Sequence, residues 1–110
     1  MTETNRPTED ERRESIRQMG MAEGALADAV DAHFWKPNEE TQRELDKARA
    51  AEMLTWLDAH IIHTRRQQQA PGDAVTLLDH LTRTRALVAD LAKRAFGADW
   101  DSSYSSKTGS

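Results

Sequence analysis

The sequence predicts an all-α fold: an antiparallel, up-down-up three-helix bundle with a mobile tail at each end. Apolar residues recur at spacings of three and four, which is typical of amphipathic helices. Pro37 and Pro71 divide this pattern into three segments, because proline cannot occupy a helix interior. The chain has 110 residues and an apolar fraction of 37%, so we expect one domain with a thin core.

The first helix is predicted over residues 9–35. Thr8 and Glu11 form a capping-box pattern, in which each side chain hydrogen-bonds the backbone of the other residue. At 100° per residue, apolar side chains and one histidine fall on a single arc, which we predict to face the core. This arc consists of Ile16, Met19, Ala22, Leu26, Val30, His33 and Phe34.

The second helix is predicted over residues 38–69, with Asn38 as its N-cap and Pro71 beyond its end. A helix of this length extends about 45 Å. Its apolar side is wide enough to contact two neighbouring helices. Its predicted seam consists of Ala50, Leu54, Leu57, Ile61 and Thr64, extended by Met53, Trp56 and His60.

The third helix is predicted over residues 73–96, from an N-cap at Asp73 to a left-handed C-cap at Gly97. Its apolar residues alternate at spacings of three and four over three heptads, as in a coiled coil. This seam consists of Ala74, Leu77, Leu81, Thr84, Val88, Leu91 and Ala95, widened by Leu78, Ala92 and Phe96.

Residues 1–8 and the Ser-rich residues 98–110 are predicted to be disordered tails, because both are polar and aperiodic. The short connections around Pro37 and Pro71 favour antiparallel neighbours. Three long helices with narrow seams bury little area per residue. We therefore expect a homodimer that completes the core.

Composition narrows the classes of function. The chain has no Cys, so it has no disulfide, no thiolate metal site and no cysteine nucleophile, and we expect a cytoplasmic protein. The net charge of −4 is not that of a polycation. We find no signal-peptide pattern and no long apolar run, so no membrane association is expected. Abundant Ala and an excess of Arg over Lys suggest a GC-rich genome, such as that of an actinobacterium or its phage.

Three histidines form one alternative hypothesis. In an antiparallel hairpin of the second and third helices, His60 and His63 come near the level of Asp79 and His80. Three imidazoles and a carboxylate suffice chemically for a zinc-type metal. No established metal motif supports the cluster, so our main prediction is no metal and no cofactor.

Four arginines form a second alternative, that of a small helical DNA-binding regulator. Arg65 and Arg66 end the second helix, and Arg83 and Arg85 lie within the third. Arginine contacts both phosphates and base edges. However, a helix-turn-helix has a shorter helix before its recognition helix, and terminal arginines also suit a helix C-terminus without any ligand.

The favoured hypothesis is a non-enzymatic protein–protein interaction module, which acts as an adaptor, inhibitor or accessory protein. Leu45 and Ile62 lie off the seam of the second helix, and Leu87 lies off that of the third. Tryptophan is a frequent anchor at protein interfaces. The predicted partner-binding residues are Trp35, Trp56, Ile62, Leu87 and Trp100, and no catalytic residue is predicted.

Overall fold

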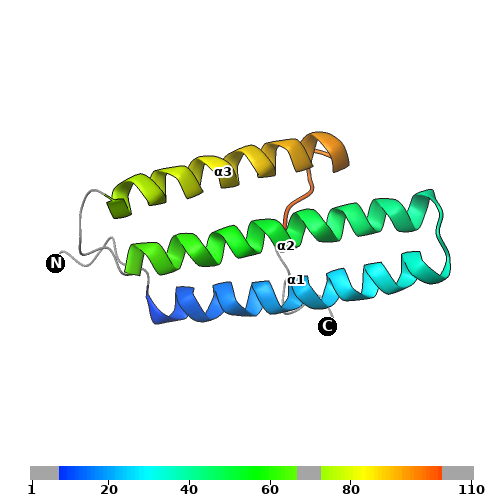
Figure 1. Cartoon of the computed structure of the whole chain (residues 1–110), viewed down its shortest axis with the longest axis horizontal. Coiled ribbons are helices and arrows are strands. Elements are labelled where there is room, and N and C mark those ends of the chain that lie inside the picture. The colour runs from blue at the N-terminus through cyan, green and yellow to red at the C-terminus, as the bar shows by residue number, and fades with distance from the viewer. Residues whose placement is uncertain (1–7, 67–72, 103–110) are drawn as a thin grey trace.

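The computed structural model describes residues 8–66 and 73–102 and confirms the all-α class. It contains α1 (Glu9–Trp35), α2 (Glu39–Arg66) and α3 (Asp73–Phe96), and no strand occurs in the described ranges. Figure 1 shows three long helices side by side, with α2 in the middle. None of the helices, as far as they are described, combines the length and the apolarity that a bilayer crossing requires.

Side-chain caps set the starts of α1 and α2. Thr8 Oγ1 accepts from the Glu11 backbone N–H at 3.1 Å, and Glu11 Oε1 accepts from the Thr8 N–H at 2.9 Å, which confirms the capping box. Asn38 Oδ1 accepts from the Thr41 N–H at 2.8 Å and caps α2. The Thr41 hydroxyl also lies 2.9 Å from His33 Nδ1, which ties the start of α2 to the end of α1.

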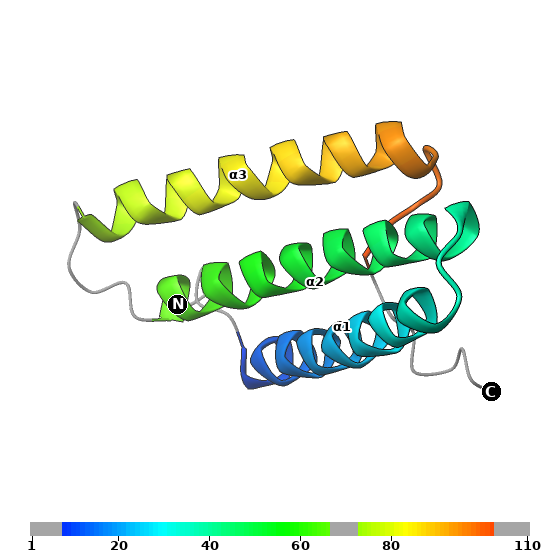
Figure 2. The same cartoon turned by 45° about the vertical axis from the view of Figure 1, so that its right-hand side comes forward.

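The middle helix, α2, makes nearly all the contacts between helices. It packs against α1 on one side and against α3 on the other, and α1 and α3 have no extensive contact with each other. The turned view in Figure 2 shows the same order of the three helices. Asp58 pairs with Arg85 and Arg43 contacts Phe96, so residue numbers fall along α3 as they rise along α2.

The core is thin. Among the described residues, Leu54 is the largest side chain that is completely buried, with 1% of its surface exposed, and most of the other buried apolar side chains are alanines. Alanine buries little apolar area, so each residue in this core contributes little hydrophobic free energy. The buried apolar residues are Ala22, Leu45, Ala48, Ala51, Leu54, Leu57 and Ala92.

Leu45 lies off the predicted seam of α2, as expected, but it is buried and not exposed. Leu45 is only 5% exposed. It lies on the same side of α2 as Ala48 and Thr55, about half a turn from the predicted seam at Leu54. The buried residues Ala51, Thr55 and Ala48 lie between Leu54 and Leu45 round the helix, so α2 buries one wide arc that contacts both neighbouring helices.

The seam predicted for α3 is also partly wrong. Leu77 and Leu91 belong to that seam, yet they are 49% and 54% exposed. Ala92 is buried instead, and Arg85 reaches α2 through Asp58. Among the described helices α3 packs extensively against α2 alone, so part of its apolar stripe stays exposed within the chain.

The chain leaves α3 at Gly97, whose φ of +122° confirms the predicted left-handed position after the helix. The Gly97 N–H donates to the Lys93 carbonyl at 2.8 Å, and the Trp100 ring packs on Phe96 with centroids 5.4 Å apart. Ser102 is buried, so the segment that follows α3 returns to the bundle at this residue. Residues 1–7 and 103–110 of the predicted tails lie outside the described residues.

Replacing Leu54 tests the position of the core. We expect Leu54→Ala to lower the free energy of unfolding by about 2–5 kcal/mol, because it leaves a cavity among buried neighbours. Leu87→Ala removes the same atoms from an exposed site and should change the free energy of unfolding by less than about 0.5 kcal/mol. Urea unfolding followed by circular dichroism measures both values. Equal losses for the two variants would contradict this position of the core.

Candidate functional site

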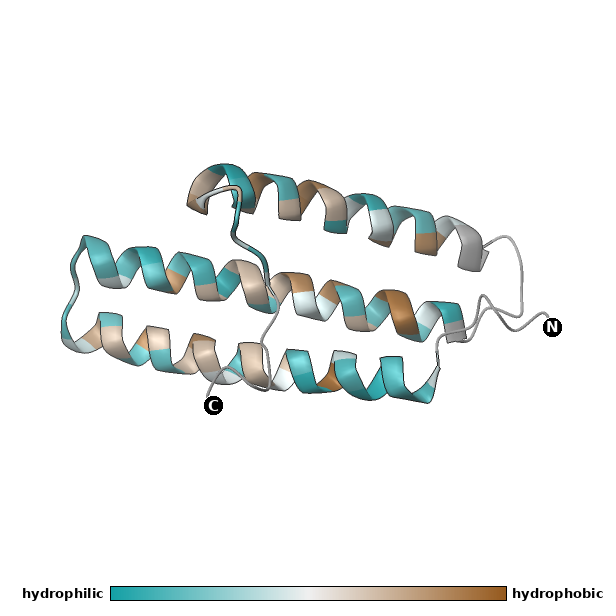
Figure 3. Ribbon diagram, turned by 180° about the vertical axis from the view of Figure 1, so that it is seen from behind, coloured by the Kyte–Doolittle hydropathy of each residue, from teal (hydrophilic) through white to brown (hydrophobic). Residues whose placement is uncertain are grey.

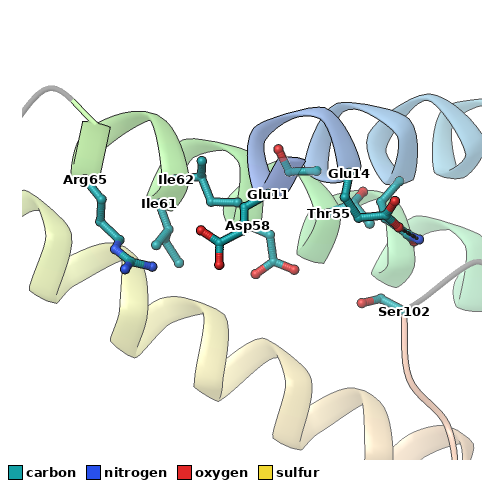
Figure 4. A pocket seen from close by; sticks show the side chains of 10 residues that line it. Glu11, Glu14, Thr55, Asp58, Ile61, Ile62, Arg65 and Ser102 are labelled. Carbon is teal, nitrogen blue, oxygen red and sulfur yellow. Dashed lines mark hydrogen bonds between the residues drawn. The ribbon is translucent and has the colours of Figure 1, made fainter. Parts of the chain in front are cut away.

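A groove lies on one side of the layer of helices, where α1 and α2 meet the C-terminal segment. It encloses about 390 Å³. Figure 3 shows this side, with the C-terminal segment reaching α2 from α3. In Figure 4, Arg65 lies at one end of the groove and Ser102 at the other. The lining residues are Glu11, Glu14, Ser15, Gln18, Thr55, Asp58, Ile61, Ile62, Arg65 and Ser102.

The carboxylate of Glu14 is bound within its own helix. Arg17 Nε donates to Glu14 Oε1 at 2.9 Å, and Gln18 Nε2 donates to Glu14 Oε2 at 2.8 Å. These hydrogen bonds, that of Arg17 above all, lower the pKa of Glu14 to about 2. The same contact raises the pKa of Arg17 above its ordinary value. Glu14 is therefore a stable anion near neutral pH and a poor proton donor.

The carboxylate of Asp58 links two helices. Arg85 Nε donates to Asp58 Oδ1 at 2.8 Å, and Arg85 Nη2 donates to Asp58 Oδ2 at 3.2 Å. This two-point geometry is the strongest form of an arginine–carboxylate pair. It fastens α3 to α2 at the rim of the groove, so we assign this pair a structural role.

Two hydroxyl groups of the groove bond to backbone carbonyls. Ser15 Oγ donates to the Arg12 carbonyl at 2.8 Å, and Thr55 Oγ1 lies 3.0 Å from the carbonyls of Ala51 and Glu52. Neither hydroxyl faces a histidine that would act as its base. The polar groups of the groove that have just been described hold the fold together.

The opposite side of the layer carries exposed apolar side chains from all three helices. On α2, Trp56 points away from Asp58 and the groove, because two residues turn a helix by about 200°. On α1, a similar offset separates Ile16 from the groove residue Glu14. On α3, Leu77 and Leu91 lie on a different side of the helix from Arg85, whose side chain points toward the groove. We call this surface the open face: it consists of Ile16, Val30 and Phe34 from α1, Met53 and Trp56 from α2, and Leu77 and Leu91 from α3.

A line of side chains at alternating spacings of three and four runs along α2 through the open face. We call this line the α2 ridge. At its centre Met53 is 50% exposed and Trp56 is 45% exposed, and the Trp56 ring lies 4.0 Å from the His60 ring between centroids. Polar residues occupy both ends. The α2 ridge consists of Asp46, Arg49, Met53, Trp56, His60 and His63.

The predicted partner-binding residues lie in different places. Trp56 is part of the open face, Trp35 is exposed at the end of α1, and Leu87 is exposed on the outer side of α3. Ile62 lines the groove and is half-buried, and Trp100 packs on Phe96. The structure does not bring the five together into one surface, and their roles in binding stay predictions.

Two of the four arginines of the DNA-binding alternative pair with carboxylates of the same chain. Arg85 pairs with Asp58, and Arg83 Nε lies 3.0 Å from Asp79 Oδ2. Arg65 lines the groove, and the side chain of Arg66 lies outside the described part of the structure. Arg83 and Arg85 therefore each already face a carboxylate, which weakens the case for a phosphate-binding surface.

The histidines of the metal alternative are not gathered. His60, His63 and His80 are all exposed, and His60 packs on Trp56. Within residues 8–66 and 73–102, no three histidine, aspartate or glutamate side chains lie close enough together to hold a metal ion. The sequence predicted that these residues lie at similar heights along the bundle. It did not predict which way their side chains point.

Sequence reasoning assigned the outer residues of the open face to the core. Ile16, Val30 and Phe34 were predicted to face inward on α1, and they are exposed. The signal in the sequence was the width of the apolar arcs, because each arc is wider than the strip that a helix can bury against a single neighbour.

Comparison with protein-family models, with curated proteins and with solved structures finds no match to this chain. The surface itself therefore carries the argument for function.

The low pKa of Glu14 depends mainly on Arg17. We expect Arg17→Met to raise the pKa of Glu14 from about 2 toward its ordinary value of 4.5, because it removes the main donor. Carboxyl carbon chemical shifts followed through an acid titration measure this pKa. Arg13→Met is the matched control, because Arg13 contacts Glu9 instead. An unchanged pKa in Arg17→Met would refute the assignment.

The same contact gives a pH dependence of stability. The pKa of Glu14 is lower in the folded chain than its ordinary value of 4.5, so the pair stabilises the fold above that pH. This contribution is lost as the pH falls from about 4.5 through about 2. Wild-type protein should lose more stability than Arg17→Met over this window, as measured by urea unfolding at each pH.

A double-mutant cycle tests the link between α2 and α3. We expect a coupling energy of about 0.5–1 kcal/mol for Asp58→Asn with Arg85→Met, because the pair is two-point but partly exposed. The exposed pair of Asp79 and Arg83 within α3 should give about 0.3–0.5 kcal/mol. Chemical unfolding measures both cycles. Zero coupling between Asp58 and Arg85 would show that the pair does not hold α3 in place.

Proposed function

We propose that this protein is a non-enzymatic protein–protein interaction module that binds other protein surfaces, including a second copy of itself. The observation that carries the proposal is the open face. Monomeric proteins rarely expose a large contiguous apolar surface, and such surfaces mark interaction sites. Seven large exposed apolar side chains from three helices share this face.

The composition of the open face supports protein binding. Aromatic residues and methionine are enriched at the centres of interfaces, whereas charged residues are depleted there. Trp56 and Met53 occupy the middle of the open face, and the charged residues of the α2 ridge lie toward its ends. A half-exposed tryptophan with an apolar surround is a suitable anchor for a partner.

The groove supports binding rather than catalysis as the role of the protein. Glu14 and Asp58 are each held by an arginine of the same chain, and the Thr55 hydroxyl contacts backbone carbonyls. A catalytic group has to be poised to exchange a proton or attack a substrate. We therefore place the function on the open face, in a cytoplasmic adaptor, inhibitor or accessory protein.

An up-down-up order of helices completed by dimerisation belongs to the same proposal. It places the short connections at the ends of the layer and leaves the sides of the helices free for contact. The paired positions of Asp58 with Arg85 and of Arg43 with Phe96 support this order.

Photocrosslinking in cells of the source organism tests the proposed function. With p-benzoyl-phenylalanine at position 56, we expect covalent adducts to protein, because this position lies at the centre of the open face. Position 21 is the matched control: Met21 is 42% exposed but lies on the part of α1 that faces away from the open face. Mass spectrometry identifies the chain in each adduct, whether this protein or another.

Two results would contradict the proposed function. One is the absence of adducts at position 56 under conditions in which the protein is abundant and folded. The other is an equal yield of the same adducts at positions 56 and 21, since that would reflect random encounters and not a specific surface.

A further inference from the structure

We infer that the occupant of the open face is a second copy of this chain, whose α2 ridge lies antiparallel on the first. This inference rests on the proposed function and names the partner at the same surface. In this arrangement the two-fold axis passes between Met53 and Trp56, and the two layers of helices form a six-helix assembly. The groove remains on the outside of both copies.

The size of the open face fits a stable dimer. The helices are about 40 Å long, and three of them at 8–10 Å spacing span about 20 Å between the outer axes, which gives on the order of 800 Å² per copy. A standard specific interface buries about 800 Å² on each partner. The side of the layer that carries the open face, its polar residues included, is therefore large enough for a specific complex without any further element.

A second copy also completes the core. Among the residues that the structure describes, Leu54 alone is a large side chain that is completely buried, whereas the adjacent Met53 is half-exposed. Stacking two open faces would bury the half-exposed apolar side chains of all three helices at once. Such burial contributes about 25 cal/mol per Å² before the cost of association.

The order of charges along the α2 ridge favours antiparallel pairing. Parallel pairing about a two-fold axis would set each Asp46 opposite its own copy, and each Arg49 likewise. Like charges placed opposite each other in an interface are strongly unfavourable. Antiparallel pairing instead brings Asp46 level with the partner's His63, a carboxylate beside an imidazole, which is a favourable contact.

Antiparallel pairing also gives the apolar residues matching neighbours. Positions 53 and 56 occupy successive places in the alternating pattern of three and four, so Met53 packs beside the partner's Trp56 in two symmetric layers. Methionine against an aromatic ring is a favourable contact. Arg49 comes level with the partner's His60, within reach of the Trp56 ring on which that histidine packs.

The oligomeric state tests the occupant. We expect light scattering after size exclusion to give about twice the 12.4 kDa chain mass for wild-type protein. Met53→Glu should raise the dimer dissociation constant by about 100-fold, because each dimer would bury two carboxylates against the partner's Trp56. Met21→Glu, which adds the same charge outside the open face, should leave it unchanged. Circular dichroism establishes that both variants keep their helices.

The Cys-free chain allows a direct test of orientation. Asp46→Cys and His63→Cys proteins are mixed and treated with a short bis-maleimide. We expect heterodimeric adducts that join position 46 to position 63. Adducts between two Asp46→Cys chains should be absent, because the two copies of position 46 lie 17 residues of helix apart, or about 25 Å. Adducts of 46 with 46 and of 63 with 63 would overturn antiparallel pairing.

Failure of this inference is distinguishable from failure of the proposed function. A wild-type monomer at all concentrations, or a dimer that Met53→Glu leaves intact, would overturn the inference. If position 56 still crosslinks to a different protein in cells, the proposed function stands with that protein as the partner. If no adduct forms there either, both proposals fail.

Discussion

The structure depends on one constraint: α2 packs against α1 and α3 on different sides, and these two helices barely meet. Asp58 fastens α3 to one side of α2, while Leu45 and Ala48 are buried on the side where α1 packs. A layer built this way has two broad sides. The C-terminal segment reaches α2 on one of them, where the groove lies, and the other is the apolar open face. Both candidate sites follow from the central position of α2.

Local signals in the sequence predicted the helices well. The sequence alone identifies the capping box of Thr8 with Glu11 and the helix-ending Gly97. Both features depend only on residues a few positions away. The all-α class followed from the periodic apolar residues between two prolines. These features are independent of how the helices are placed relative to one another.

The packing side of each helix was harder to predict, because it depends on where the neighbours lie. Leu45 falls outside the seam through Leu54, yet a second neighbour buries it. Leu91 continues a regular heptad pattern, yet it is exposed since α3 has one neighbour in this chain. A heptad pattern shows that a side chain favours burial but not which chain buries it. The open face is the part of the pattern that the chain itself does not bury.

The central claim is that Met53 is exposed in a single chain and is covered when the protein associates. Methyl NMR with a soluble paramagnetic probe measures this directly, since the methionine methyl signals are few and resolved by substitution. We predict that the Met53 methyl is broadened by the probe in dilute protein and becomes protected as concentration rises, while Met21 stays broadened throughout. Protection of Met53 at every dilution down to the monomer would show that it is buried within one chain, which would contradict the account.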